Sequence, residues 1–515
     1  MTSHISETNR LTFRETDEAG NPTATYIYSG DVASITSSKT PAGRVDVISS
    51  SSSTSSWSAK PLVSSLSDVF LPSGYPQSVS DDYLPYQIFN TVLTQATHRK
   101  QDSLQAFCSS IAGLLSSRAV LQGVGVGNAN ASPTSALLLH ILQDISGRIA
   151  TICFAHRVGT ALEPECKTYR LAADVFNDIA MILDCLSPGV PAGPARVIVL
   201  STAGVLRALC GVAGGSSKAS LSAHFAKWGN LAELNAKDSS QETVISLFGM
   251  LVGSVVISHI TSFSTTWLIL LILLALHLSM NYAAVRAVQM TSLNRQRANI
   301  AFSALLGSDR GLALDLGLDL DPSSTPSEKK WTILTPAQVS KHERIFHRDG
   351  ALQWTQHSST HTTTQHLGSA QIGVSMSTFL GSSGSGSGSG STSFQRTLPL
   401  QRLAAVFTDE FYIMFLVPSS ATGGNAKWHA SILLKRGCAV EHQLKAWAHA
   451  LLAARDLGRI TTGSDVDAVL AVVEKALVLL NTDARFERYL TRLSSVGWNV
   501  DIAALETRGG RRIDI

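Results

Sequence analysis

Two long uncharged segments in the middle of the chain constrain its fold more than any other feature. Residues 244–260 carry no charged side chain over 17 positions, and residues 267–285 carry none over 19. Each approaches the roughly 20 apolar residues with which a helix crosses a bilayer. The connector between them is short and uncharged, so the pair is predicted to form a membrane-spanning helical hairpin. A hairpin buried inside a large helical domain is the alternative.

The residues that flank this hairpin favour the membrane interpretation. Lys227 and Lys237 precede it, and Arg286, Arg295 and Arg297 follow it, which places both ends on the cytoplasm-equivalent side by the positive-inside rule. Charged residues make up only 15% of the chain, against roughly 25% in an ordinary soluble domain. We therefore expect an integral membrane protein in contact with lipid, with two or more spans and in a membrane that the sequence does not identify.

The region before the hairpin consists of further apolar helical patterns. They lie near residues 102–122, 134–158, 166–186 and 194–213. These helices carry charges, and a charge at the bilayer centre costs at least roughly 2.5 kcal/mol, so they either pack inside a bundle or lie outside the lipid. The number of spans before residue 240 stays open. The expected fold is mainly α, a membrane-associated helical bundle followed by a smaller α+β C-terminal domain.

Composition divides the chain into four parts. Residues 1–64 are rich in Ser and Thr without an apolar period, which predicts a disordered tail. Residues 65–300 form the helical membrane domain. Residues 301–397 are expected to be a flexible linker with one short helix near 334–346 and a Gly/Ser tract at 384–390.

The last part, residues 398–515, is predicted to be a separate α+β domain. Residues 411–417 and 429–434 have the pattern of strands around a Gly-rich turn, which indicates a hairpin. Two amphipathic helices are expected after it, over residues 440–452 and 466–480, the second capped by Ser464 or Asp465.

Motifs of the common enzyme classes are missing from the sequence. There is no complete dinucleotide fingerprint, P-loop, G-x-S-x-G or H-E-x-x-H motif, and no C-x-x-C pair among the six cysteines. The net charge of +3 gives no broad attraction to nucleic acid. We expect a protein without nucleic-acid partners, without a metal, without a resident cofactor and without catalytic residues.

Two polar clusters remain as candidate ligand or ion sites. Asp174, Asn177 and Asp178 share one helix face and can hold a cation or a hydrogen-bond network, or can serve as buried partners for Arg170 or Arg148. The second cluster precedes the hairpin and contains His224, Asn230, Glu233, Asn235, Lys237, Asp238, Gln241 and Glu242. It either binds a polar ligand or partner, or caps the next helix with Asp238 or Ser239 as N-cap and Glu242 in the first turn.

Small residues at four-residue spacing predict close helix packing at Gly249 and Gly253, because a face without Cβ atoms lets two helices approach. The glycines of residues 123–127 and 211–215 are better explained as helix ends.

Several of these segments together resemble the root UVB sensitive family, over roughly residues 65–300. The matching segments are LPSGYPQSV at 71–79, DYLPYQ at 82–87, the residues Lys167, Arg170, Asp174, Asn177 and Asp178, GVAGG at 211–215, HFA at 224–226, NLAE at 230–233, AKDSSQET at 236–243 and LNRQR at 293–297. Ser239 stands where the family usually has glycine, and Glu233 where it usually has aspartate.

The resemblance implies a membrane-associated protein, which in plants is tied to ultraviolet-B responses of the root, vitamin B6 homeostasis and pairing between family members. It brings no established catalytic residue. Pyridoxal phosphate or a related vitamer is a candidate ligand, and a homo- or hetero-oligomer with family members is a candidate assembly.

Our leading hypothesis is a membrane protein acting in metabolite homeostasis without a covalent step. One alternative is a transporter of a small polar metabolite whose path is lined by Asp174, Asp178, Lys237 and Asp238. Another is a membrane adaptor that binds partners through its C-terminal domain. An enzyme with a Schiff base on Lys237 is the least supported, because no phosphate cradle accompanies that lysine.

Overall fold

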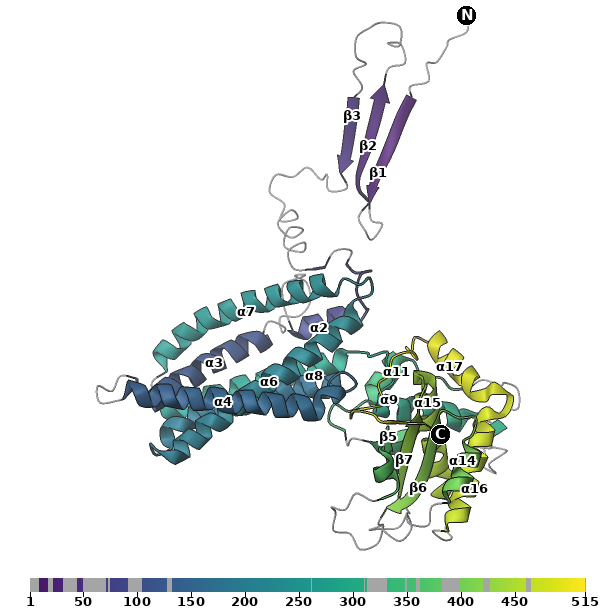
Figure 1. Ribbon diagram of the computed structural model, residues 1–515. Helices are drawn as coiled ribbons and strands as arrows, with labels where there is room; N and C mark the ends of the chain where they lie inside the picture. The colour runs from purple at the N-terminus through teal and green to yellow at the C-terminus, as the bar shows by residue number, and fades with distance from the viewer. Residues whose placement is uncertain are drawn as a thin grey trace, which may run out of the picture.

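A helical bundle and an α+β domain lie side by side in the computed structural model (Figure 1). The structure describes residues 9–16, 22–30, 44–49, 71–72, 75–90, 104–126, 132–260, 262–309, 311–312, 331–347, 350–357, 362–381, 399–419, 427–459 and 465–514. This arrangement confirms the expected mainly α fold with a smaller α+β part toward the C-terminus.

The bundle contains the helices that the apolar patterns predict and one more, α2 (Tyr83–Asn90), that they do not. The predicted members are α3 (Leu104–Gly123), α4 (Pro133–Val158), α5 (Cys166–Leu186), α6 (Pro194–Phe225), α7 (Leu231–His259) and α8 (Phe263–Ala287), with the short 3-10 turns η2 (Gly159–Ala161) and η3 (Ser187–Gly189). Helix α6 runs on through the glycines at 211–215, which we had expected to end it. A Cβ on Gly214 would touch the Cβ of Ala173 at 3.6 Å, so Gly214 lies at the contact of α6 with α5, whereas Gly211 and Gly215 have no atom within 4 Å of a Cβ.

Four helices are long and apolar enough to cross a membrane: α4, α6, α7 and α8. In the most apolar stretch of each helix, the buried share is only 6% in α4, 17% in α6 and α7, and 33% in α8. A hairpin enclosed in a protein core would be mostly buried. Many large apolar side chains on their outer faces are exposed, among them Leu137, Ile141, Ile152, Ile198, Phe248, Leu251, Val255, Leu268, Leu271 and Ile272. Helix α4 also exposes one ion pair, between Asp144 and Arg148 at 2.8 Å.

Three antiparallel strands lie within the segment that we expected to be a disordered tail. They are β1 (Asn9–Thr16), β2 (Pro22–Gly30) and β3 (Arg44–Ser49), in the order β1-β2-β3. The structure differs from the expectation here because each strand contains β-branched or aromatic residues that favour strands, even though the segment is rich in Ser and Thr. The rest of residues 1–64 lies outside the described residues.

A five-stranded sheet forms the centre of the C-terminal domain. Its strands are β4 (Ala351–His357), β5 (Thr362–Ile372), β6 (Tyr412–Ser419), β7 (Lys427–Lys435) and β8 (Arg512–Ile513), with the order β4-β5-β7-β6 and β8 paired to β7. The expected β6–β7 hairpin is present and antiparallel, whereas β5 runs parallel to β7. The Gly-rich turn at 423–425 lies outside the described residues.

Helices cover this sheet. They are α9 (Arg295–Ser308), α11 (Pro336–His342), α12 (Met376–Phe379), α14 (Leu400–Val406), α15 (Val440–Leu457), α16 (Val466–Asn481), the 3-10 turn η4 (Thr482–Ala484) and α17 (Arg485–Ser495). Asp465 caps α16 as predicted, since its side chain accepts a hydrogen bond from the Asp467 N–H. The fully buried Trp447 of α15 donates from Nε1 to the Asn299 side chain of α9 at 2.9 Å.

The structure differs from the expected linker at residues 301–397. Helix α9 and strands β4 and β5 belong to the core of the C-terminal domain, which includes Phe302, Trp354, Leu367 and Ile372. Polar residues on the other face of the β4–β5 hairpin produce the Ser/Thr/His pattern that suggested a coil. The Gly/Ser tract at 384–390 lies outside the described residues.

Candidate functional site

A buried polar group lies inside the bundle, between α3, α5 and α8. The Asp178 Oδ1 atom of α5 lies 2.8 Å from the His277 Nδ1 atom of α8. The His277 Nε2 atom is 3.1 Å from the amide nitrogen of Asn281 and 3.3 Å from that of Gln105 on α3. Because amide nitrogens donate, Nε2 is the acceptor in both contacts, and the proton of a neutral His277 belongs on Nδ1, facing Asp178.

One polar atom of this group, Asp174 Oδ2, has no hydrogen-bond partner among the described residues. Asp178 Oδ1 and His277 Nδ1 make no aligned hydrogen bond, but they face each other at 2.8 Å. Asp174 is 8% exposed, Asp178 6% and His277 2%, so bulk water does not reach these side chains to form hydrogen bonds with them. A buried polar group without a partner is costly, and such groups persist where they serve a ligand, an ion or a proton.

The structure separates the alternatives for the first predicted cluster. It brings Asp174 and Asp178 into the bundle interior, while Asn177 is only half-buried. Arg170 is within electrostatic range of Asp174. Arg148 instead pairs with Asp144 on the outside of α4, so it is not a partner of the cluster.

A second polar network joins α2, α6 and α7. Lys218 Nζ lies 2.6 Å from Asp238 Oδ2 and 2.9 Å from Glu242 Oε2. The Gln87 amide donates to Asp238 Oδ1 at 2.9 Å and to the Tyr83 hydroxyl at 3.0 Å. The cavity beside this network has a volume of about 10 Å³, room for about one water molecule, so the network is closed in this structure.

This network corrects the capping interpretation of the second predicted cluster. Helix α7 begins at Leu231, so Asp238 and Ser239 lie inside the helix rather than at its N-cap, and Glu242 lies beyond the first turn. Asn230 occupies the N-cap position without a side-chain cap, and both of its side-chain polar atoms are buried without a hydrogen-bond partner in the described part of the chain.

Two further members of the cluster also belong to α7: Gln241 is buried and Lys237 is half-buried. His224, at the end of α6, is 3.0 Å from the Asp82 carboxylate, which also accepts the Gln289 N–H at 2.6 Å. Burial raises the pKa of Asp82, but His224 and the hydrogen bonds outweigh it, so the pKa lies below its ordinary value. Asp82 therefore links the chain before α2 to the end of α6 and to the segment just after α8.

Gly249 and Gly253 bring α7 into close contact with α3. A Cβ on Gly249 would lie 2.7 Å from Ser110 Cβ and 3.2 Å from the Cα of Phe107. A Cβ on Gly253 would lie 2.8 Å from a methyl group of Leu114. The close approach expected from the spacing of these glycines is present, and its partner is α3.

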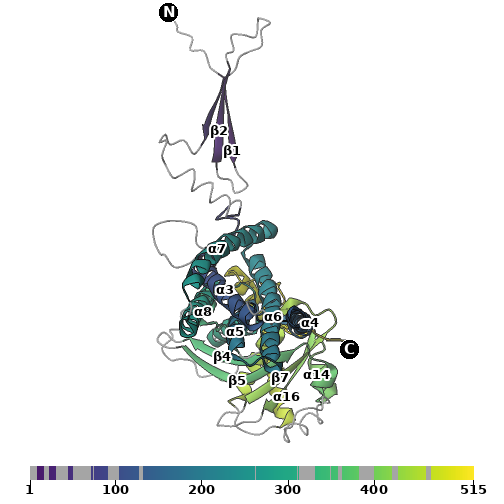
Figure 2. The same ribbon diagram turned by 90° about the vertical axis from the view of Figure 1, so that its left-hand side faces the viewer.

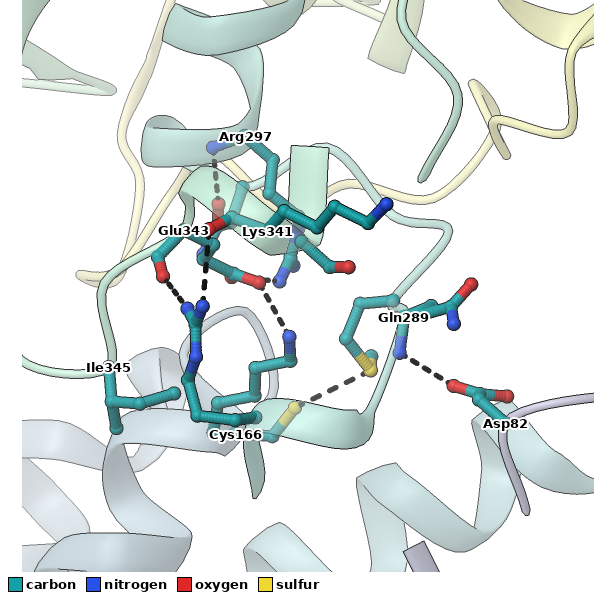
Figure 3. A network of polar contacts seen from close by, with 12 residues as sticks. Asp82, Cys166, Gln289, Arg297, Lys341, Glu343 and Ile345 are labelled. Carbon is teal, nitrogen blue, oxygen red and sulfur yellow. Dashed lines mark hydrogen bonds and ion pairs between the residues drawn. The ribbon is translucent and has the colours of Figure 1, made fainter. Parts of the chain in front are cut away.

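A buried charge network joins the bundle to the C-terminal domain (Figure 3). Glu343, just after α11, has one carboxylate oxygen 2.5 Å from Lys167 Nζ of α5 and the other 2.8 Å from Arg297 Nη1 of α9. Arg286 of α8 donates to the Glu343 carbonyl. Burial disfavours the charge on Glu343, yet Lys167 and Arg297 outweigh it and keep its pKa below the ordinary value.

Sequence reasoning missed several of these residues. Lys218, Gln87 and His277 form central contacts of the two networks, and the binding of Glu343 by Lys167 and Arg297 is not predicted by the sequence. One signal was present: His277 and Asn281 are polar residues four positions apart in an otherwise apolar span, which places them on one helix face.

No metal site is apparent in the parts of the chain that the structure describes. No group of three or more His, Cys, Asp or Glu side chains has a suitable arrangement there.

Comparisons with known proteins agree on one family. Residues 56–309 match the family described as the vitamin B6 photo-protection and homoeostasis domain. RUS family member 1 of Dictyostelium discoideum is 44% identical over 285 residues, which are 55% of this chain and 47% of that protein. Protein root UVB sensitive 3 of Arabidopsis thaliana is 28% identical over 439 residues, which are 84% of this chain and 82% of that protein.

The match therefore spans about half the length of the Dictyostelium relative and most of the Arabidopsis one. No solved structure matches the chain. The matched region, residues 56–309, contains the whole bundle, both polar networks and Arg297 of the junction.

Proposed function

Because the chain belongs to the root UVB sensitive family, we propose that it is an integral membrane protein that acts in metabolite homeostasis by binding a small polar metabolite without a covalent step. The name of the matched domain makes a vitamin B6 vitamer the candidate ligand. An assembly with further family members is part of the same proposal.

The outer surface of the bundle supports the membrane part of the proposal. Four helices are long enough to span a bilayer, and their exposed faces are rich in large aliphatic side chains. A monomeric soluble protein rarely exposes apolar patches of this extent. Lipid is the solvent that suits such a surface.

The observation that carries the ligand part is the buried polar group of Asp174, Asp178 and His277. These side chains lie inside a bundle whose outside is apolar, and the Oδ2 atom of Asp174 has no hydrogen-bond partner among the described residues. Ionisable side chains that face the interior of a membrane bundle mark substrate, ion or proton pathways. Two carboxylates and an imidazole suit a ligand with hydrogen-bond donors, and pyridine vitamers carry such groups.

One observation favours the transporter among the alternatives. Arg170 is within electrostatic range of Asp174 of the first polar group and of Asp238 and Glu242 of the second network. A continuous series of ionisable groups through a bundle is what a path for a polar solute requires. The second network is closed in this structure, so transport would need a second conformation in which it opens.

Reconstitution into proteoliposomes tests the proposed function. Uptake and equilibrium binding of labelled pyridoxine, pyridoxal and pyridoxal phosphate are measured for the parent protein, for Asp178→Asn and for Asp144→Asn. Asp144→Asn is the control, because it makes the same chemical change at an exposed carboxylate of α4. Saturable uptake that Asp178→Asn abolishes supports the transporter, and binding without uptake that the same variant abolishes supports homeostasis by binding. If the folded protein shows neither uptake nor binding, the ligand assignment is refuted.

A further inference from the structure

A large polar cleft lies where α8 meets the C-terminal domain. Its volume is about 760 Å³, within the range of roughly 300–1,000 Å³ that is common for small-molecule sites. One wall comes from Tyr282 and Arg286 of α8, and the others come from α9, α11, the segment after α11, β4 and β5. Both parts of the molecule thus contribute to one cavity.

The charge of the cleft is strongly one-sided. Arg286, Lys341 and Arg344 line it, and Glu343 is its one carboxylate. Glu343 is already bound by Lys167 and Arg297, both of which lie behind the cleft wall. Among the described residues, no carboxylate is within ion-pair distance of Arg286, Lys341 or Arg344. Within the described part of the chain, three cations therefore share a cavity without an available counter-charge.

The segment that carries two of these cations is held in place. Arg286 donates to the Glu343 and Lys341 carbonyls, the latter at 3.1 Å. Thr168 of α5 donates to the Ile345 carbonyl at 2.6 Å. Because these backbone contacts fix residues 341–345, the Lys341 and Arg344 side chains are attached to a rigid base while they remain exposed. A site on a rigid base loses little entropy when it binds a ligand.

Neutral donors complete the lining. Thr355, Thr364 and Gln353 also line the cleft, as does Gln296, whose amide is bonded to the Arg344 backbone. Lysine, arginine, hydroxyl and amide donors are the groups that proteins use to bind phosphate oxygens. A phosphate monoester carries close to two negative charges at neutral pH, which three cations can balance.

We propose that this cleft is a binding site for a phosphate monoester, with Arg286, Lys341 and Arg344 as the phosphate-binding side chains. The phosphate belongs either to a water-soluble metabolite or to a lipid headgroup. The exposed Tyr282 and Phe346 at the rim would suit the glycerol region of a lipid as well as the organic part of a metabolite. The site is separate from the interior of the bundle, so it does not depend on the proposed function.

The test measures binding to the full chain in neutral detergent at low ionic strength by titration calorimetry. The soluble probes are glycerol 3-phosphate and, as a matched neutral compound, glycerol. The lipid probes are dihexanoyl phosphatidic acid and dihexanoyl phosphatidylcholine. The site variant is Lys341→Ala/Arg344→Ala, and the control is Lys475→Ala/Arg492→Ala, which removes two exposed cations from α16 and α17.

The proposal predicts that glycerol 3-phosphate binds, that glycerol does not, and that the site variant weakens binding by about 10- to 100-fold while the control leaves it unchanged. The melting temperature should be the same in all three proteins, because the substituted side chains are exposed. Binding of phosphatidic acid alone, with the same loss in the site variant, would assign the phosphate to a lipid. The proposal is overturned if neither phosphate compound binds, or if the site variant binds as tightly as the parent protein.

Discussion

Lys167 Nζ lies 2.5 Å from Glu343 Oε2, and this buried ion pair joins α5 of the bundle to the segment after α11 in the C-terminal domain. Arg297 binds the other oxygen of the same carboxylate from α9. Figure 2 shows the sheet of the C-terminal domain directly below the bundle helices. The charge network and the shared phosphate cleft make this contact specific, so the two parts are expected to unfold together.

Substitution of Glu343 should therefore destabilise the whole protein. Glu343→Gln leaves Lys167 and Arg297 buried without a counter-charge, and loss of one partner of a buried pair typically costs about 3–5 kcal/mol. Chemical unfolding in detergent should show that loss. Glu441→Gln, at an exposed carboxylate, is the control and should change stability by less than about 0.5 kcal/mol. Equal stabilities of the two variants would contradict the assigned role.

The same carboxylate gives a pH dependence. The pKa of Glu343 is lower in the folded protein than in the unfolded chain, so its contribution to stability is complete above the ordinary pKa of glutamate and disappears as the pH falls through the folded value. The parent protein should lose stability in acid more steeply than Glu343→Gln. Unfolding midpoints measured from pH 7 to pH 3 check this, and parallel curves would count against it.

His449 should contribute a separate pH effect in the C-terminal domain. Burial lowers the pKa of His449 to about 4, and its neutral ring accepts from the Tyr412 hydroxyl and donates to the Val473 carbonyl. Between pH 6.5, roughly the pKa of histidine in the unfolded chain, and about pH 4, the unfolded chain binds one more proton than the folded protein. As the pH falls through this range, the stability of the folded protein decreases by on the order of 3 kcal/mol. His449→Gln should flatten the curve in this window. The exposed His156→Gln variant should keep the parent slope.

Two Gly→Ala substitutions should have opposite effects on stability, one at the contact between α7 and α3 and one on an open face of α6. At Gly249 the new methyl group would overlap Ser110 and the Phe107 backbone, which should cost about 1–3 kcal/mol. Gly215 of α6 has no atom within 4 Å of its Cβ position, so alanine there should stabilise the helix by about 0.5–1 kcal/mol. Thermal unfolding in detergent distinguishes the two, and a harmless Gly249→Ala would contradict the packing.

The helices of the bundle could be predicted from the sequence because their apolar patterns are long and their breaks are marked by Pro, Gly and polar residues. The close approach at Gly249 and Gly253 follows from the same local information. Residues Asp174, Asp178 and Asp238 could be selected as polar exceptions within apolar helices, although their partners could not. Lys218 and His277 come from other helices, and only the fold brings them to these carboxylates.

The boundary of the C-terminal domain could not be predicted for a different reason. Strands β4 and β5 are rich in Gln, Thr and His, so in the sequence they resemble a coil, and β5 pairs in parallel with β7, a strand about sixty residues away. Helix α9 follows the bundle directly in sequence but buries Phe302 and Leu305 in the core of the C-terminal domain. Such long-range pairings leave no local signature.

The most direct test of the central claim is the melting temperature of the detergent-purified full chain in the presence of vitamin B6 vitamers. A ligand that binds only the native state stabilises it by about 2.7 kcal/mol at one hundred times its dissociation constant. The account predicts a concentration-dependent rise for at least one vitamer in the parent protein and in Asp144→Asn, and no rise in Asp178→Asn. A rise that persists in Asp178→Asn, or no rise in the folded parent protein with any vitamer, would contradict the claim that the interior of the bundle binds this ligand.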